Sequence, residues 1–447
     1  MRFRLTVALL CSTLGALTVG CAGGGSSATQ PATVVPAAVR EAPAIGSAGR
    51  QAHSGVRRTL TATRCSGTGI GGFIGGAGGN GSNGNNPNAA KGTYAVAGGG
   101  TGNEACDDWS AIVGGFENLA SGTGVDAFIG AGENNVVTGF DTDSAIVAGN
   151  GNTVSNDESA IIEGHGNSVT VGDALIGGGT DNAISGTAED GVIVGGNANH
   201  LTALLGFIGA GTNNTVSGEG AYIAAGGYNT ASGEGAVIDG GFNSTAAGTF
   251  ATIPGGYVNS AAGTYSFAAG ARASAAQTGT FVWSDGSDGD AILTSTRAYQ
   301  FLARASGGVT FWTNAASTVG AQLAPGSGTW ASASDRNLKT DVARIDDAAV
   351  LDKVAALPIE RWSYKSERGV RHVGPMAQDF YAAFGVGEDD KHITSIDEDG
   401  VALAAIKALH AENTRLRSAS LAQSAKIAAM QAQLAHLSAQ IAGLHAR

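Results

Sequence analysis

The chain has 447 residues, of which 72 are glycine and only 14% are charged, so its composition is not that of an ordinary globular enzyme. The glycines follow no G-X-Y triplet, which excludes collagen, and 43% hydrophobic residues argue against a disordered chain. The net charge is −12, and no Lys or Arg stands between Gly92 and Ala271. Nucleic acid and anionic lipid are therefore poor partners for this stretch.

The first 21 residues have the pattern of an export signal. Arg2 and Arg4 precede an apolar run over 5–19, which is too short to predict a membrane span, and small residues follow. The motif "LTVGC" at 17–21 resembles a bacterial lipobox, which implies that Cys21 is lipidated; simple cleavage nearby is the alternative. The resemblance implies attachment to the outer membrane or cell surface, with the lipid as the only contact with the membrane.

Residues 22–69 mix Gly, Ser, Ala, Thr, Pro and Gln without periodicity, which predicts a flexible linker. Beyond the signal the chain keeps two cysteines, Cys65 and Cys106. In an oxidising envelope they could pair, but their spacing alone does not decide it. No motif predicts a metal site or a cofactor.

Short repeats fill residues 70–279. "IVGGFEN" (112–118), "FIGAGEN" (128–134) and "IVGGNAN" (193–199) are examples. Their asparagines recur every 14 to 18 residues, at Asn118, Asn134, Asn152, Asn167, Asn182, Asn199, Asn213, Asn229, Asn243 and Asn259. Such a period predicts one coil of a solenoid.

Within each coil, a short strand such as 111–113 is expected to point one apolar side chain inward. The glycines permit a tight turn, and the asparagine either adopts a left-handed conformation or forms a ladder with its neighbours. These repeats resemble the head of YadA-type trimeric autotransporter adhesins. The resemblance implies a mainly β fold, a left-handed parallel β-roll and a homotrimer, with no catalytic residue. A host-surface or glycan ligand is expected, of unknown identity.

Residues 280–333 bring aromatic residues and longer strands separated by turns, which predicts a β connector. A different pattern begins at "SASDRNLKTDV" (332–342). Three further blocks follow in order, "VLDKVAALPIERWSYK" (350–365), "RHVGPMAQDFYAAFGVG" (371–387) and "IDEDGVALAAIKAL" (396–409). Residues 334–409 thereby resemble the peptidase S74 domain, the intramolecular chaperone of endosialidase tailspikes, which implies a mixed α/β domain that cleaves itself.

The resemblance places a Ser-Lys dyad on Ser334 and Lys339 and the scissile bond between Ala333 and Ser334. A serine hydroxyl is a poor nucleophile until a base takes its proton, and a lysine can do so only when its amine is neutral. Burial favours the neutral amine. We therefore expect Lys339 to be covered once the trimer has folded.

Three further polar residues are expected to support the dyad. Asp335 either orients the serine or lysine, or caps a helix that begins near Arg336. His372 and Gln378 belong to the second block and are expected close to the site, although a structural role in packing is an alternative for each.

The last segment, 402–447, has apolar residues at heptad spacing, which predicts a coiled coil. The a positions are Ile406, Asn413, Ser420, Ile427, Leu434 and Ile441, and the d positions are Ala402, Leu409, Leu416, Gln423, Met430, Leu437 and Leu444. Isoleucine at a is compatible with three strands. A single amphipathic helix lying on its own domain is the alternative.

Together these patterns predict a secreted, lipid-anchored trimeric fibre whose C-terminal chaperone removes itself once per chain. Two alternatives carry different functions: a phage or prophage tail fibre with the same chaperone, and a structural surface protein without enzymatic activity. The export signal argues against the tail fibre. A transcription factor released by self-cleavage would need a DNA-binding element, which the chain does not show.

Overall fold

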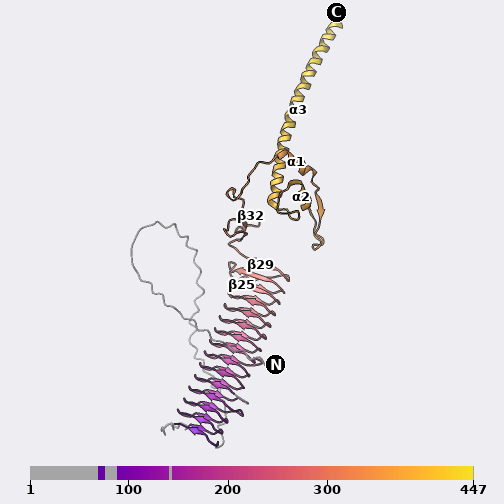
Figure 1. Cartoon of the computed structure of the whole chain (residues 1–447). Coiled ribbons are helices and arrows are strands. Elements are labelled where there is room, and N and C mark those ends of the chain that lie inside the picture. Colours follow the sequence, from indigo (N-terminus) through magenta and orange to yellow (C-terminus); the bar gives the residue numbers. More distant parts are fainter. Residues whose placement is uncertain (1–68, 76–87, 140–142, 446–447) are drawn as a thin grey trace, which may run out of the picture. The chain divides into compact units, whose positions relative to one another are not determined.

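The computed structural model describes residues 69–75, 88–139 and 143–445. The predicted signal peptide, most of the linker, Cys21 and Cys65 lie outside the described residues. The chain divides into two compact units, Met1–Gly235 and Ala236–Arg447. Both carry the coils that the repeats predict, and the second also carries the helices (Figure 1).

Each coil of the first unit contributes two strands of two residues. The odd-numbered strands form one parallel ladder and the even-numbered strands another, as in the pairs Ile161↔Ile176 and Val154↔Val169. The odd-numbered strands are β1 Phe73–Ile74, β3 Val96–Ala97, β5 Ala111–Ile112, β7 Phe128–Ile129, β9 Ala145–Ile146, β11 Ala160–Ile161, β13 Leu175–Ile176, β15 Val192–Ile193, β17 Phe207–Ile208 and β19 Tyr222–Ile223. The even-numbered strands are β2 Ala89–Ala90, β4 Glu104–Ala105, β6 Leu119–Ala120, β8 Val136–Val137, β10 Thr153–Val154, β12 Ser168–Val169, β14 Ala183–Ile184, β16 His200–Leu201, β18 Thr215–Val216 and β20 Thr230–Ala231. The fold is therefore a parallel β-solenoid, which confirms the predicted class.

The core of the solenoid is a stack of aliphatic side chains, because the second residue of nearly every strand points inward. Ile112, Ile161 and Ile208 on the odd ladder are fully buried, as is Val154 on the even ladder. Glycines close the coil where the backbones meet: at Gly164, with φ +113°, an added Cβ would lie 2.2 Å from the Gly179 carbonyl oxygen. No side chain fits there.

A ladder of buried amides runs along one corner of the coils. The Asn152 Oδ1 accepts hydrogen bonds from the Asn167 backbone N at 3.0 Å and from the Asn167 Nδ2 at 3.1 Å. The same buried position is held in the first unit by Asn88, Asn103, Asn118, Asn135, Asn152, Asn167, Asn182, Asn199, Asn214 and Asn229, and in the second unit by Ser244 and Asn259. Buried polar groups that are all paired fix the register of one coil on the next.

The repeat asparagines of the sequence divide between the two roles expected for them. Asn134, Asn213 and Asn243 have left-handed backbones, with φ of 56°, 54° and 54°, and the residue after each enters the ladder. The other seven are ladder members themselves. The left-handed residue and the ladder residue are thus neighbours in the chain.

The second unit begins with the same two parallel ladders. The odd one contains β21 Val237–Ile238, β23 Thr252–Ile253, β25 Phe267–Ala271, β27 Phe281–Asp285 and β29 Phe301–Arg304, and the even one contains β22 Thr245–Ala246, β24 Ser260–Ala261, β26 Ala273–Ala275 and β28 Leu293–Thr294. Parallel pairing thus continues past residue 279, through Trp283↔Ala303. An antiparallel sheet follows, made of β30 Val309–Trp312, β31 Gly320–Leu323 and β32 Trp330–Ser332.

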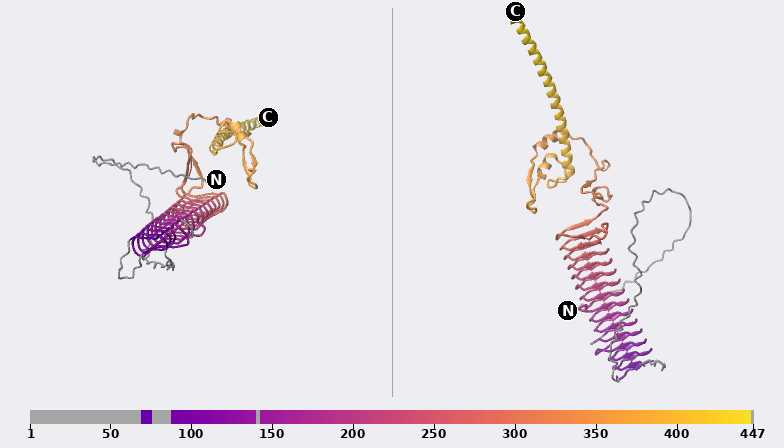
Figure 2. Two further views of the ribbon diagram at one scale, coloured as in Figure 1. Left: turned by 60° about the horizontal axis from the view of Figure 1, so that its bottom comes forward. Right: turned by 180° about the vertical axis from the view of Figure 1, so that it is seen from behind.

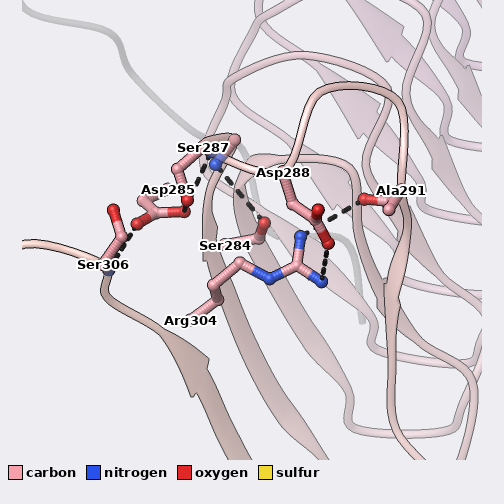
Figure 3. A network of polar contacts seen from close by, with 8 residues as sticks. Ser284, Asp285, Ser287, Asp288, Ala291, Arg304 and Ser306 are labelled. Carbon is pink, nitrogen blue, oxygen red and sulfur yellow. Dashed lines mark hydrogen bonds and ion pairs between the residues drawn. The ribbon is translucent and has the colours of Figure 1, made fainter. Parts of the chain in front are cut away.

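A polar network closes the last coil (Figure 3). The Asp285 carboxylate accepts hydrogen bonds from the Ser306 backbone N at 2.6 Å and from the Ser287 backbone N at 3.0 Å, and Arg304 pairs with Asp288 at 3.1 Å. Desolvation would raise the pKa of Asp285, but the hydrogen bonds from Ser306 and Ser287 outweigh it and hold the pKa well below its usual range. The ionised carboxylate therefore ties the segment after β29 to the end of β27.

The C-terminal region adds a hairpin, one 3₁₀ helix and three α-helices. Its elements are η1 Arg336–Leu338, α1 Asp347–Ala356, β33 Glu360–Trp362, β34 His372–Gly374, α2 Ala377–Phe384 and α3 Ser395–His445. Helix α1 packs on α3, where Lys407 Nζ lies 2.7 Å from Asp347 Oδ2, and Phe380 of α2 is buried. Helices therefore follow the solenoid, as expected for the mixed α/β domain, while the coiled coil at 402–447 stays a prediction.

Helix α3 is one unbroken helix of 51 residues (Figure 2). From Leu409 to Leu444 every described side chain is exposed, including Ile427, Leu434 and Ile441 at a positions. The alternative of a helix lying on its own domain is therefore wrong for this segment. Within the described ranges, no helix is long and apolar enough to cross a membrane.

Candidate active site

Ser334 and Lys339 meet across a single tight turn. The Asp335 carboxylate caps η1 by accepting from the Asn337 backbone N at 2.9 Å and from the Asn337 Nδ2 at 3.0 Å. The 3₁₀ turn reverses the chain, because the Leu338 N donates to the Asp335 carbonyl oxygen at 3.1 Å. The Lys339 Nζ then lies 2.7 Å from the Ser334 Oγ. A nucleophile and a candidate base are thus within hydrogen-bonding distance.

The bond before Ser334 lies between a strand and this turn. Ser332 ends β32 and pairs with Ala321, and the Ala333 N donates to the Gly320 carbonyl oxygen at 3.1 Å. Ala333 and Ser334 are both exposed, so the peptide bond between them is accessible. The predicted scissile bond therefore joins a backbone held by pairing to the turn that holds the dyad.

The dyad is open to water in a single chain, since both Ser334 and Lys339 are exposed. A lysine takes a proton from a hydroxyl only when its amine is neutral, and burial favours that form. The geometry of a Ser-Lys pair is thus in place, while the desolvation that would make the amine a base is not supplied by the described part of one chain.

The three supporting candidates lie in different surroundings. Asp335 caps the 3₁₀ helix η1, which is one of the two roles expected for it. His372 lies on β34 and Gln378 is the exposed second residue of α2. Within the part of the chain that the structure describes, neither His372 nor Gln378 is hydrogen-bonded to Ser334 or Lys339, so their expected place at the site stays a prediction.

His372 instead belongs to an aromatic cluster at the β33–β34 hairpin. Its ring stacks on Trp362 at 4.6 Å between centroids and meets Tyr364 edge-on at 5.7 Å, and its Nε2 lies 3.3 Å from Glu367 Oε2. The Trp362 Nε1 is buried without a hydrogen-bond partner among the described residues. No motif marks Trp362 or Glu367, because the pairing Trp362↔His372 brings them together across the hairpin.

Metal ligands and cysteines are further kinds of candidate site residue. In the described segments, no three His, Cys, Asp or Glu side chains are placed to hold a metal ion. Cys106 is disulfide-bonded, and the three other cysteines of the chain lie outside the described residues.

Comparison with known families gives one match. Residues 334–385 match the family model of the chaperone of endosialidase, Peptidase_S74. This segment is similar to that chaperone. The match begins at the serine of the Ser334–Lys339 pair and ends at Gly385, the left-handed C-cap of α2. No curated protein matches the chain.

Proposed function

We propose that the chain is a homotrimeric surface fibre whose C-terminal chaperone assembles three solenoids and then cuts itself off between Ala333 and Ser334. The observation that carries this proposal is the 2.7 Å contact between Lys339 Nζ and Ser334 Oγ at the start of the matched segment. The glycine-closed coils support a shaft of the YadA-like head type. The mature fibre serves adhesion or surface display.

The cleavage step uses the two side chains as nucleophile and base. Ser334 Oγ bonds to the Ala333 carbonyl carbon while its proton passes to Lys339 Nζ. The C–N bond then breaks as the proton moves to the Ser334 nitrogen, which leaves an ester between Ala333 and Ser334 Oγ. Water hydrolyses this ester, giving an Ala333 carboxylate on the shaft and a free Ser334 amino group on the chaperone. One cut is made per chain.

Assembly of the trimer is the step that activates the dyad. The exposed apolar a and d side chains of α3 would be buried by two further copies of the helix. Three chaperones held together in this way would cover Lys339, and desolvation favours its neutral form. Such a helper suits a parallel solenoid, because non-local β structure forms slowly and exposes strand edges while it forms.

Denaturing gels with intact-mass analysis test the proposal. We expect the wild-type chain to give a fragment of about 12 kDa that begins at Ser334 and the Ser334→Ala chain to stay whole. Ser332→Ala, a matched change at the exposed end of β32, should be cut as the wild type is. Equal mobility of the wild-type and Ser334→Ala chains on the denaturing gel would contradict the self-cleavage proposal.

We further propose that the fibre is exported and anchored by lipid at Cys21. The disulfide at Cys106 supports export, since structural disulfides persist in oxidising compartments. Metabolic labelling with palmitate checks the anchor: the label should appear on the wild-type chain and be lost from Cys21→Ala. A label that persists on the variant, or that never appears, contradicts lipidation.

A further inference from the structure

A column of aromatic side chains follows one corner of the coils in the second unit. Phe250, Tyr265 and Tyr299 occupy the same place in their coils, and Gly279 takes that place in the coil between the two tyrosines. The corner is defined by one repeated hydrogen bond to the coil before it, which runs from Tyr265 N to Thr249 O, from Gly279 N to Thr264 O and from Tyr299 N to Thr278 O, at 2.9, 2.8 and 2.8 Å.

The fold does not require aromatic residues at this corner. Phe250, Tyr265 and Tyr299 have φ of 54°, 56° and 60°, a left-handed conformation that is strained for bulky residues. Gly279 closes its coil with φ 65°, as does Gly235 at the same corner of the first unit with φ 60°. Asp173 and Leu205 hold the equivalent corner of first-unit coils with φ of 55° each, so the corner accepts glycine, acidic and apolar residues and does not itself call for a ring.

The rings are presented to solvent rather than to the core. Phe250, Tyr265 and Tyr299 are 50%, 65% and 81% exposed. The Phe250 and Tyr265 rings are parallel, with centroids 5.7 Å apart and planes within 5°. Beside them run Thr249, Thr264 and Thr278, whose hydroxyls make no hydrogen bond within the described residues. Exposed aromatic rings, two of which stack on each other along the column, thus alternate with hydroxyl groups that are free to bind a ligand.

This combination suits a carbohydrate. The pyranose ring of an equatorially linked sugar has apolar C–H faces that pack on aromatic rings, and hydroxyls at its edge that bond to polar side chains. Coils repeat at the strand spacing of about 4.8 Å, which is on the scale of one sugar unit, so a straight chain of sugars can follow the column. The six side chains are uncharged, which favours a neutral ligand.

We propose that this corner strip, made of Phe250, Tyr265 and Tyr299 with Thr249, Thr264 and Thr278, binds a neutral β-1,4-linked polysaccharide. The inference rests on the proposed adhesive function and names its ligand class. A second copy of the chain would bind a different surface better, the flat sheet face that carries Phe267, Phe281 and Phe301. The rings of these residues stack at 4.6 and 4.8 Å between centroids. Two flat faces bury more apolar area against each other than two corners do.

The test replaces two tyrosines of the strip by glycine, the residue found at the same corner at position 279. The double variant Tyr265→Gly, Tyr299→Gly should still fold, because Gly279 already closes a coil at the same corner with φ 65°. Tyr228→Gly is the matched control, since Tyr228 is 53% exposed with φ 58° at the other corner. Sedimentation with cellulose or chitin and titration with cellohexaose or chitohexaose measure binding. We expect the wild type to bind one of the two polymers, the double variant to bind at least tenfold more weakly and the control to change less than twofold.

The same samples, run on denaturing and native gels, separate this inference from the proposed function. Intact cleavage and trimers with the tenfold loss of binding support the strip. Failure of the wild type to bind either polymer, or an equal loss in Tyr228→Gly, overturns it, whatever the cleavage gel shows. Loss of trimers in the double variant also overturns it and assigns the corner to a contact between chains. A chain that binds but is never cut overturns only the self-cleaving chaperone.

Discussion

Replacing Lys339 by methionine is expected to leave the chain uncut at Ala333–Ser334 while the trimer still assembles. Methionine keeps much of the apolar stem of lysine but cannot accept the Ser334 proton, and a serine without a base is a poor nucleophile. Loss of a general base costs about 10²- to 10⁴-fold in rate. A time course of the fragment on denaturing gels measures the effect, with native gels to follow the trimer.

Lys353→Met is the matched control for this change. Lys353 is an exposed lysine on α1, within the same matched segment, and its loss removes the same charge and amine. The control should be cut at the wild-type rate. Cleavage of Lys339→Met at that rate would show that the contact between Lys339 and Ser334 has no catalytic role.

The second large effect is expected from a single buried amide. Asn214→Ala should lower the free energy of unfolding of the coils by about 3 kcal/mol, since buried polar groups left without a partner cost about 1 to 3 kcal/mol each. Its Nδ2 donates to the Ala210 and Gly226 carbonyl oxygens at 3.2 and 3.0 Å, and its Oδ1 accepts from the Asn229 backbone N at 3.1 Å. Thermal unfolding followed by circular dichroism measures the loss.

The neighbouring residue provides the control. Asn213 has the left-handed backbone of the turn, which glycine adopts without strain, so Asn213→Gly should change the free energy of unfolding by less than about 0.5 kcal/mol. Similar losses in the two variants would contradict the assignment of the ladder to Asn214.

The pair Asn213 and Asn214 also shows what could be predicted of the fold. The period of the repeats and the inward isoleucines follow from apolar side chains that must alternate with glycine turns. Which asparagine is buried does not follow, because the turn and the ladder are adjacent and both favour this residue. Only the folded coil separates the two, because it gives Asn213 the left-handed backbone and buries Asn214.

The candidate site, too, could be predicted from the sequence only in part. The contact between Ser334 and Lys339 was expected, and the tight turn between them, capped by Asp335, accounts for it locally. The surroundings of His372 were not expected, because they depend on a hairpin that pairs His372 with Trp362, ten residues away. In the proposed trimer, other copies of the chain would bury Lys339, and the sequence of one chain does not reveal the contacts that they would make.

The spacing of the amide ladder has a consequence for how such a shaft can change over generations. Successive ladder residues are 15 or 17 apart, as for Asn167 to Asn182 and Asn182 to Asn199. The two extra residues enter the corner between an even strand and the next odd one, as in 185–191 compared with 217–221, while strand register is kept. Insertions there leave neighbouring coils unaltered, and whole coils can be duplicated or deleted by recombination. Shaft length and corner chemistry can therefore evolve separately from the assembly machinery.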